Sequence, residues 1–125
     1  MKVLKEVPEI EGFLRRLLAE EAGELKRAKD STEELELIGN KPVQQGRQRV
    51  AGHYFCSVVP KAKDVRLYFF PLYTHKEAFR LSPELQKKLK GKTCFHLKNL
   101  DENLQEELRA MVKEGLKVYQ ADALL

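Results

Sequence analysis

Two apolar segments separated by a short polar turn constrain the fold of this chain more than any other feature. Val50–Val59 is rich in β-branched and aromatic residues and is almost continuously hydrophobic, which is typical of a strand buried in a sheet. Pro60 is expected to end this strand, because proline has no amide hydrogen to donate to a neighbour. The residues PKAKD then predict a turn, and Val65–Phe70 predicts the partner strand. The chain should therefore contain a central antiparallel hairpin.

The N-terminal part predicts one helix and one further strand. Residues 8–28 carry apolar side chains at spacings of three and four, which indicates an amphipathic helix after Pro8. Leu35 and Leu37 alternate with glutamates, which favours a strand. A turn over residues 39–42 follows, and the sequence VQQGRQRV after it has no apolar face. We interpret that segment as an exposed strand or a loop.

The C-terminal part predicts short helices, a strand and a long helix. Thr74 and Glu77 have the spacing of a capping box, and Ser82 followed by Pro83 should start a second helix that runs to about residue 90 and ends at Gly91. Residues 93–97 predict a short strand. Beyond Asn99 or Asp101 a long helix has one apolar stripe, formed by Leu104, Leu108, Met111, Val112, Leu116 and Tyr119.

This element order predicts an α+β fold with an antiparallel sheet of about five strands and the N- and C-terminal helices packed on one face. A chain of 125 residues has room for one core, so residues 1–125 are expected to form a single domain. No apolar run approaches the length of a membrane span, and two well-separated cysteines predict reduced thiols rather than a disulfide framework. These features indicate a cytoplasmic protein that is not in a membrane.

The segment Val65–Phe79 concentrates aromatic residues in a chain with only 8% aromatics, and its strand has two faces. Val65, Leu67 and Phe69 should face the core, which turns the alternate residues to the other side. Rings beside cationic side chains can bind flat or anionic ligands. The candidate ligand-binding residues are Arg66, Tyr68, Phe70, Tyr73, His75, Lys92 and His96. The favoured alternative is that a loop, a helix or a partner in a homodimer covers these rings.

Two other function classes are weaker. A lysine cluster has no acidic residue between Glu84 and Asp101, but a solvated helix end explains it equally well, so the sequence disfavours a nucleic-acid partner. The cluster consists of Lys87, Lys88, Lys90, Lys92 and Lys98. No spacing of cysteines, histidines or carboxylates singles out a catalytic set, so we predict no enzyme activity and no cofactor.

Several segments resemble a known family. YFCSVVP, LYFFPLYTH, LSPELQKKLKGKTCFHLKNLD and EGLKVY, which lie between Tyr54 and Tyr119, are similar to the YdhG-like domain-of-unknown-function family. The resemblance implies an α+β sandwich with a frataxin-like fold. It suggests as an alternative function an intracellular iron chaperone that would use Glu20 and Glu24 of the first helix, with His53 or His75. The leading prediction is a small binding or interaction domain for an anionic or aromatic ligand or a protein partner.

Overall fold

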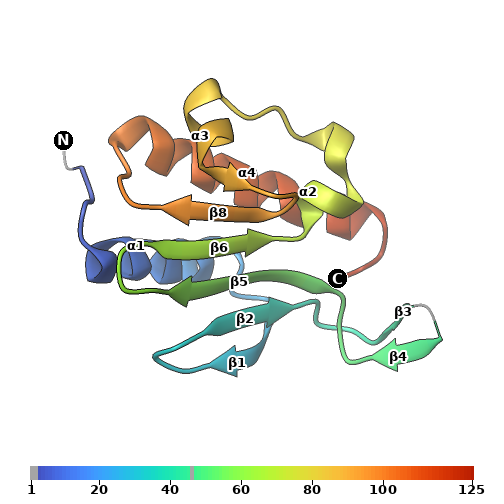
Figure 1. Ribbon diagram of the computed structural model, residues 1–125. Coiled ribbons are helices and arrows are strands. Elements are labelled where there is room, and N and C mark those ends of the chain that lie inside the picture. Colours follow the sequence, from blue (N-terminus) through green and yellow to red (C-terminus); the bar gives the residue numbers. More distant parts are fainter. Residues whose placement is uncertain (1–2, 46) are drawn as a thin grey trace.

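The computed structural model describes residues 3–45 and 47–125. Within them, six strands form one antiparallel sheet in the order β1-β2-β5-β6-β8-β7 (Figure 1). The strands are β1 (Lys26–Asp30), β2 (Leu35–Ile38), β5 (Tyr54–Pro60), β6 (Val65–Phe69), β7 (Leu89–Lys90) and β8 (Cys94–Leu97). The α+β class and the antiparallel sheet are confirmed, and the sheet has six strands rather than about five.

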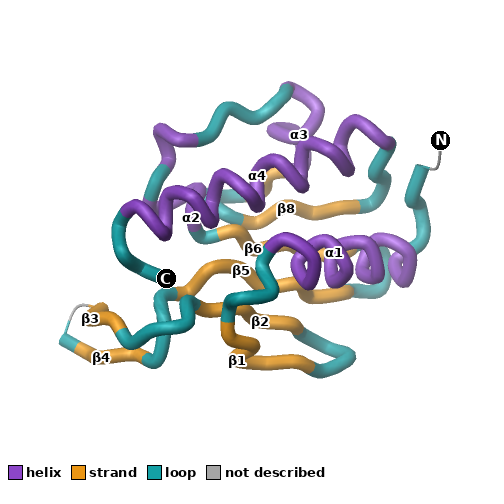
Figure 2. The backbone as a smooth tube through the Cα atoms, turned by 180° about the vertical axis from the view of Figure 1, so that it is seen from behind, coloured by secondary structure: helices purple, strands orange, loops and turns teal. Residues whose placement is uncertain are grey.

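Two further strands form a separate hairpin outside this sheet. They are β3 (Val43–Gln45) and β4 (Gln48–Val50), which pair with each other and with no other strand of the described residues. In both Figure 1 and Figure 2 the hairpin projects outward from the molecule, beside the ends of β2 and β5. The segment predicted as an exposed strand or a loop is therefore a projecting β-ribbon.

Two long helices lie side by side behind the sheet as it is seen in Figure 1 and in front of it in Figure 2. They are α1 (Val7–Glu21) and α4 (Glu102–Ala121), and no helix among the described residues is long and apolar enough to cross a lipid bilayer. The short elements α2 (Pro71–Thr74), η1 (Lys76–Ala78) and α3 (Pro83–Lys88) lead from β6 around to β7. The sheet face opposite α1 and α4 has no helix over it in either view.

The core lies between the sheet and the two long helices. Val65, Leu67 and Phe69 of β6 are at most 1% exposed, which confirms the predicted alternation of that strand. Every residue of the predicted α4 stripe is buried as well. Phe55 and Cys56 are adjacent in β5 and are both buried, because a register shift against β2 places a bulge there.

The first predicted helix is too long, and the strand that follows it was missed. Helix α1 ends at Glu21, and Lys26–Asp30 is the edge strand β1, in which every residue is exposed. An edge strand of the sequence KRAKD shows no alternation of apolar and polar residues. Leu25 and Ala28 continue the apolar spacing of the helix, so the sequence pattern predicts helix where the structure has a strand.

Two other boundaries differ from the prediction. The strand predicted for Val50–Val59 begins only at Tyr54, and it includes Pro60, which pairs with Val65 at the end of the ladder. Thr74 does not cap a helix but is the last residue of α2, which starts at Pro71. Proline suits the first turn of a helix, so Pro71 is a stronger start signal than the capping-box spacing of Thr74 and Glu77.

The two predicted caps of α3 and α4 are confirmed. The Ser82 hydroxyl accepts a hydrogen bond from the Leu85 amide at 3.1 Å, and the Asp101 carboxylate accepts one from the Leu104 amide at 2.8 Å. Helix α3 ends at Lys88, two residues before the prediction. Gly91 has φ of +86°, a conformation that glycine adopts without strain, and it forms the turn from β7 into β8.

Candidate functional site

The open face of the sheet carries the alternate residues of the central strands. The ladder pairs Arg66 with His96 and Tyr68 with Cys94, so these four side chains share the face away from the two long helices. All four are partly exposed. The structure therefore brings together three predicted site residues, Arg66, Tyr68 and His96, on one surface.

A buried carboxylate organises one end of this face. Asp64 is only 6% exposed, and it accepts a hydrogen bond from Nε of Arg66 at 3.1 Å. Its other oxygen lies 3.8 Å from Nδ1 of His96. The hydrogen bond to Asp64 raises the pKa of the Arg66 guanidinium. Because Arg66 already has an anionic partner, this end of the face is a poor site for an additional anion.

The middle of the open face is more neutral. The Tyr54 and Ser57 hydroxyls are 2.6 Å apart, and partial burial raises the pKa of the Tyr54 phenol. Partial burial also raises the pKa values of Tyr68 and of Cys94 beside it. These groups are therefore uncharged at neutral pH, and they present hydroxyl and thiol groups rather than charges.

The other end of the face carries a group of stacked aromatic rings, and a lysine lies over the last ring. The Phe70 ring lies 5.4 Å from Tyr54 and 5.6 Å from Tyr73, measured between ring centroids. Tyr73 is 56% exposed, and Nζ of Lys92 lies 5.4 Å from its ring centroid, within the range of a cation–π contact. The structure thus joins Phe70, Tyr73 and Lys92, three predicted site residues, into one group.

A pocket of about 440 Å³ adjoins this stack, between the segment that follows β6 and the segment from α3 to the β7–β8 turn. Leu72, Phe79, Leu81 and Leu89 give it an apolar floor, and the first is buried while the other three are half-buried against the core. The remaining lining residues are Tyr73, Lys76, Gln86, Gly91 and Lys92. Among the described residues, the lining thus contains two lysines and no acidic residue.

His75 is not part of this pocket. Its Nδ1 lies 2.8 Å from the Thr74 hydroxyl, and its Nε2 lies 2.5 Å from a carboxylate oxygen of Asp122. The chain of hydroxyl, imidazole and carboxylate resembles a nucleophile with its base, but none of the three residues lines the pocket. The contact links the end of α2 to the end of α4.

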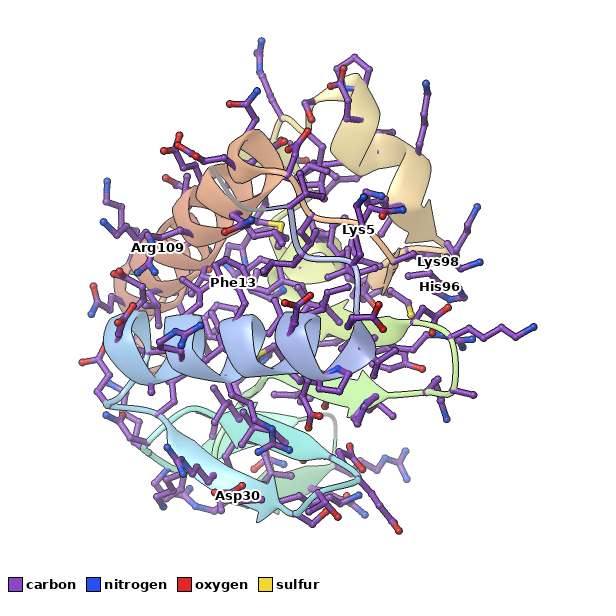
Figure 3. The ribbon with its side chains drawn as sticks, turned by 90° about the vertical axis from the view of Figure 1, so that its left-hand side faces the viewer. Lys5, Phe13, Asp30, His96, Lys98 and Arg109 are labelled. Carbon is purple, nitrogen blue, oxygen red and sulfur yellow. The ribbon has the colours of Figure 1, made fainter. Side chains whose placement is uncertain are left out.

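The carboxylates of the iron-chaperone alternative are engaged in contacts with α4, and Glu24 lies in the turn after α1 rather than in the first helix. Arg109 of α4, labelled in Figure 3, donates to Glu20 at 2.9 Å and to Glu21 at 2.5 Å. The Glu24 carboxylate accepts from Gln120 at 3.4 Å. Within residues 3–45 and 47–125, no three His, Cys, Asp or Glu side chains are grouped so that they could hold a metal ion.

The lysine cluster of the sequence divides between two surfaces. Lys92 reaches the pocket, whereas Lys87, Lys88, Lys90 and Lys98 line a shallow groove with His96 and the acidic residues Asp64 and Glu84. Figure 3 shows Lys98 and His96 next to each other at the surface. The groove has mixed charge, in contrast to the pocket.

Sequence reasoning missed most of the pocket. Lys76, Phe79, Leu81, Gln86 and Leu89 were not named as site residues, because they come from two segments whose contact depends on how the chain folds back from α2 to α3. Asp64 was missed too. No local pattern indicated it, because Asp64 belongs to the predicted turn before the strand and not to the strand itself.

The two thiols should differ sharply in reactivity. Burial raises the pKa of Cys56 far above its usual range, and partial burial raises the pKa of Cys94 to a smaller extent. We expect a disulfide reagent at pH 8 to modify Cys94 slowly in the native protein and Cys56 only after unfolding. Cys94→Ser should remove the native reaction, and rapid modification of Cys56 in folded Cys94→Ser protein would contradict the burial of β5.

Comparison with known proteins gives no relative from which function could be transferred, because no family model, curated protein or solved structure matches the chain.

Proposed function

We propose that this chain is a small non-enzymatic binding domain whose pocket takes an organic anion with a flat, apolar body. One observation carries the proposal: the pocket combines a floor of four apolar side chains with a rim that has two lysines and no acid. Its volume of about 440 Å³ lies in the range of small-molecule sites. The ligand surface predicted around Phe70, Tyr73 and Lys92 is then the entrance of this pocket.

The two parts of the ligand would meet different parts of the pocket. The apolar body would cover Phe79, Leu81 and Leu89, which gains about 25 cal/mol for each Å² removed from water. The anionic group would lie at the rim near the ammonium groups of Lys76 and Lys92. Both lysines are exposed, so each contributes modestly to affinity and mainly favours anions over neutral molecules.

The proposal includes a YdhG-like domain with a frataxin-like arrangement, in which the first and last helices cover one sheet face. The element order, with a helix at each end of the antiparallel strands, supports it. The side-by-side placement of α1 and α4 in Figure 2 supports it as well. The open sheet face beside the pocket remains a candidate surface for a protein partner.

A pair of fluorescent probes tests the proposal. Anilinonaphthalene sulfonate is a flat aromatic anion, and phenylnaphthylamine has nearly the same rings without the sulfonate. We expect the sulfonate to bind the folded protein more tightly than the neutral probe. The double variant Lys76→Gln, Lys92→Gln should weaken the sulfonate about tenfold and leave the neutral probe almost unchanged, since two exposed ion pairs contribute about 1.4 kcal/mol together.

Lys61→Gln, Lys63→Gln is the matched control, because it removes the same charge from the exposed turn between β5 and β6. Both double variants should keep the thermal midpoint of the parent, which excludes probe binding to a loosened core. Equal loss of sulfonate binding in the two double variants would show a general charge effect and would refute the pocket as the site.

A further inference from the structure

The projecting hairpin β3–β4 is not explained by burial. Val43 and Val50, which pair at its base, are only half-buried, and Arg47, Gln48 and Arg49 are exposed. An isolated two-stranded hairpin has marginal stability in water. A ribbon that adds almost nothing to the core is a candidate for an interaction with another molecule.

The base of the hairpin is nevertheless held firmly. The Gly39 amide donates to the His53 carbonyl at 2.8 Å, and a Cβ atom on Gly52 would overlap the Gly39 carbonyl group. The side-chain amide of Asn40 also donates to the Glu24 carbonyl at 3.3 Å. Two glycines therefore allow the chain to cross itself closely, and this crossing fixes where the ribbon leaves the sheet.

The ribbon has an unusual charge for this chain. The sequence contains no Asp or Glu from Asn40 to Lys63, and within this stretch the hairpin region carries Lys41, Arg47 and Arg49. The edge strand β1, by contrast, has its cations beside acids: Arg27 pairs with Asp30 at 2.7 Å. The hairpin is thus a cationic projection. The lysine cluster is also free of acids in sequence, but in the structure it lines a groove together with Asp64 and Glu84.

We propose that the hairpin β3–β4 inserts into the major groove of double-stranded DNA. A two-stranded ribbon matches the width of that groove, and ribbons of this kind contact base edges in other folds. Arginine and glutamine are the side chains that pair in bidentate fashion with guanine and adenine. Arg49 and its cross-strand partner Gln44 share one face of the ribbon and provide both types. The major groove of an RNA duplex is too narrow for such a ribbon.

This surface is independent of the organic-anion pocket. In Figure 1 the hairpin and α3 lie on opposite sides of the molecule, so the two proposals can fail separately. The prediction against a nucleic-acid partner rested on the lysine cluster, which lies mainly on α3 and β7 and not on the hairpin.

Fluorescence anisotropy with a labelled DNA duplex of about 20 base pairs, measured between about 20 and 200 mM salt, tests the proposal. The three cations of the hairpin displace condensed counterions whether they contact phosphates or bases, so the logarithm of the binding constant should fall with the logarithm of salt at a slope of about −2.7. Each of Lys41→Gln, Arg47→Gln and Arg49→Gln should make that slope shallower by about 0.9. The triple variant should lose detectable binding.

Lys87→Gln, Lys88→Gln, Lys90→Gln is the matched control, because it removes the same net charge on the side away from the hairpin. This variant should bind the duplex nearly as well as the parent. All variants should keep the parent's far-ultraviolet circular dichroism, since the substituted side chains of the hairpin are exposed. Equal weakening by the two triple variants, equal affinity for an RNA duplex, or no binding at the lowest salt would each overturn the proposal.

Discussion

Phe69→Ala is expected to lower the free energy of unfolding by about 3–5 kcal/mol, whereas Phe70→Ala should lower it by only about 1–2 kcal/mol. The two residues are adjacent in sequence and chemically identical. Phe69, the last residue of β6, is fully buried, whereas Phe70, which precedes α2, turns to the other side and is partly exposed.

The physical reason lies in what each ring contacts. Phe69 meets Phe55 and Phe79 edge-on, with centroids 5.3 and 5.7 Å apart, so its removal leaves a cavity that rigid neighbours cannot fill. Phe70 lies against Tyr54 and Tyr73 at the edge of the open face. Water can occupy the space that its ring leaves.

Urea denaturation followed by circular dichroism measures both values, and the two variants should have the parent's dependence on denaturant. Equal losses would mean that something covers the open face as thoroughly as α1 and α4 cover the other. In that case the aromatic stack would be covered and could not form the entrance to the pocket.

The faces of the central strands could be predicted because side chains alternate along a strand with a period of two. In Val65–Phe69 the apolar residues Val65, Leu67 and Phe69 were sufficient to show which face meets the core. The stripe and the cap of α4 followed from equally local patterns. The strand β1 could not be predicted this way. All five of its residues are exposed, so no burial pattern distinguishes it from the end of a helix.

The candidate site was predictable only in part, for a different reason. Tyr73 and Lys92 were both named, but their contact depends on a long-range fold in which residues 72–81 return toward the turn at Gly91. Arg66 and His96 were both candidate residues, and the pairing of β6 with β8 places them opposite each other. Sequence pattern could not show that Asp64 is buried beside Arg66, or that His75 is turned toward Asp122.

The packing of α4 against the sheet leads to a second large effect. Gly115 is buried in the middle of that helix, and a Cβ atom on it would lie 2.6 Å from Cζ of Phe69 and 3.2 Å from Cζ of Phe55. Gly115→Ala should therefore destabilise the protein, although alanine is the better helix former. The parent helix approaches the sheet this closely because residue 115 has no side chain.

Gly12→Ala in α1 is the matched control, since a Cβ atom at that position meets nothing within 4 Å. Both substitutions gain about 1 kcal/mol of helix propensity, so Gly12→Ala should raise the free energy of unfolding by that amount. Gly115→Ala should lower it by about 2 kcal/mol, because an overpacking cost near the upper end of about 1–3 kcal/mol opposes the same gain. Denaturation of the two variants in parallel isolates the packing cost as the difference between them, about 3 kcal/mol. Equal stabilisation of both variants would show that α4 does not pack tightly against Phe69. The argument that rigid neighbours keep the Phe69→Ala cavity open would then fail as well.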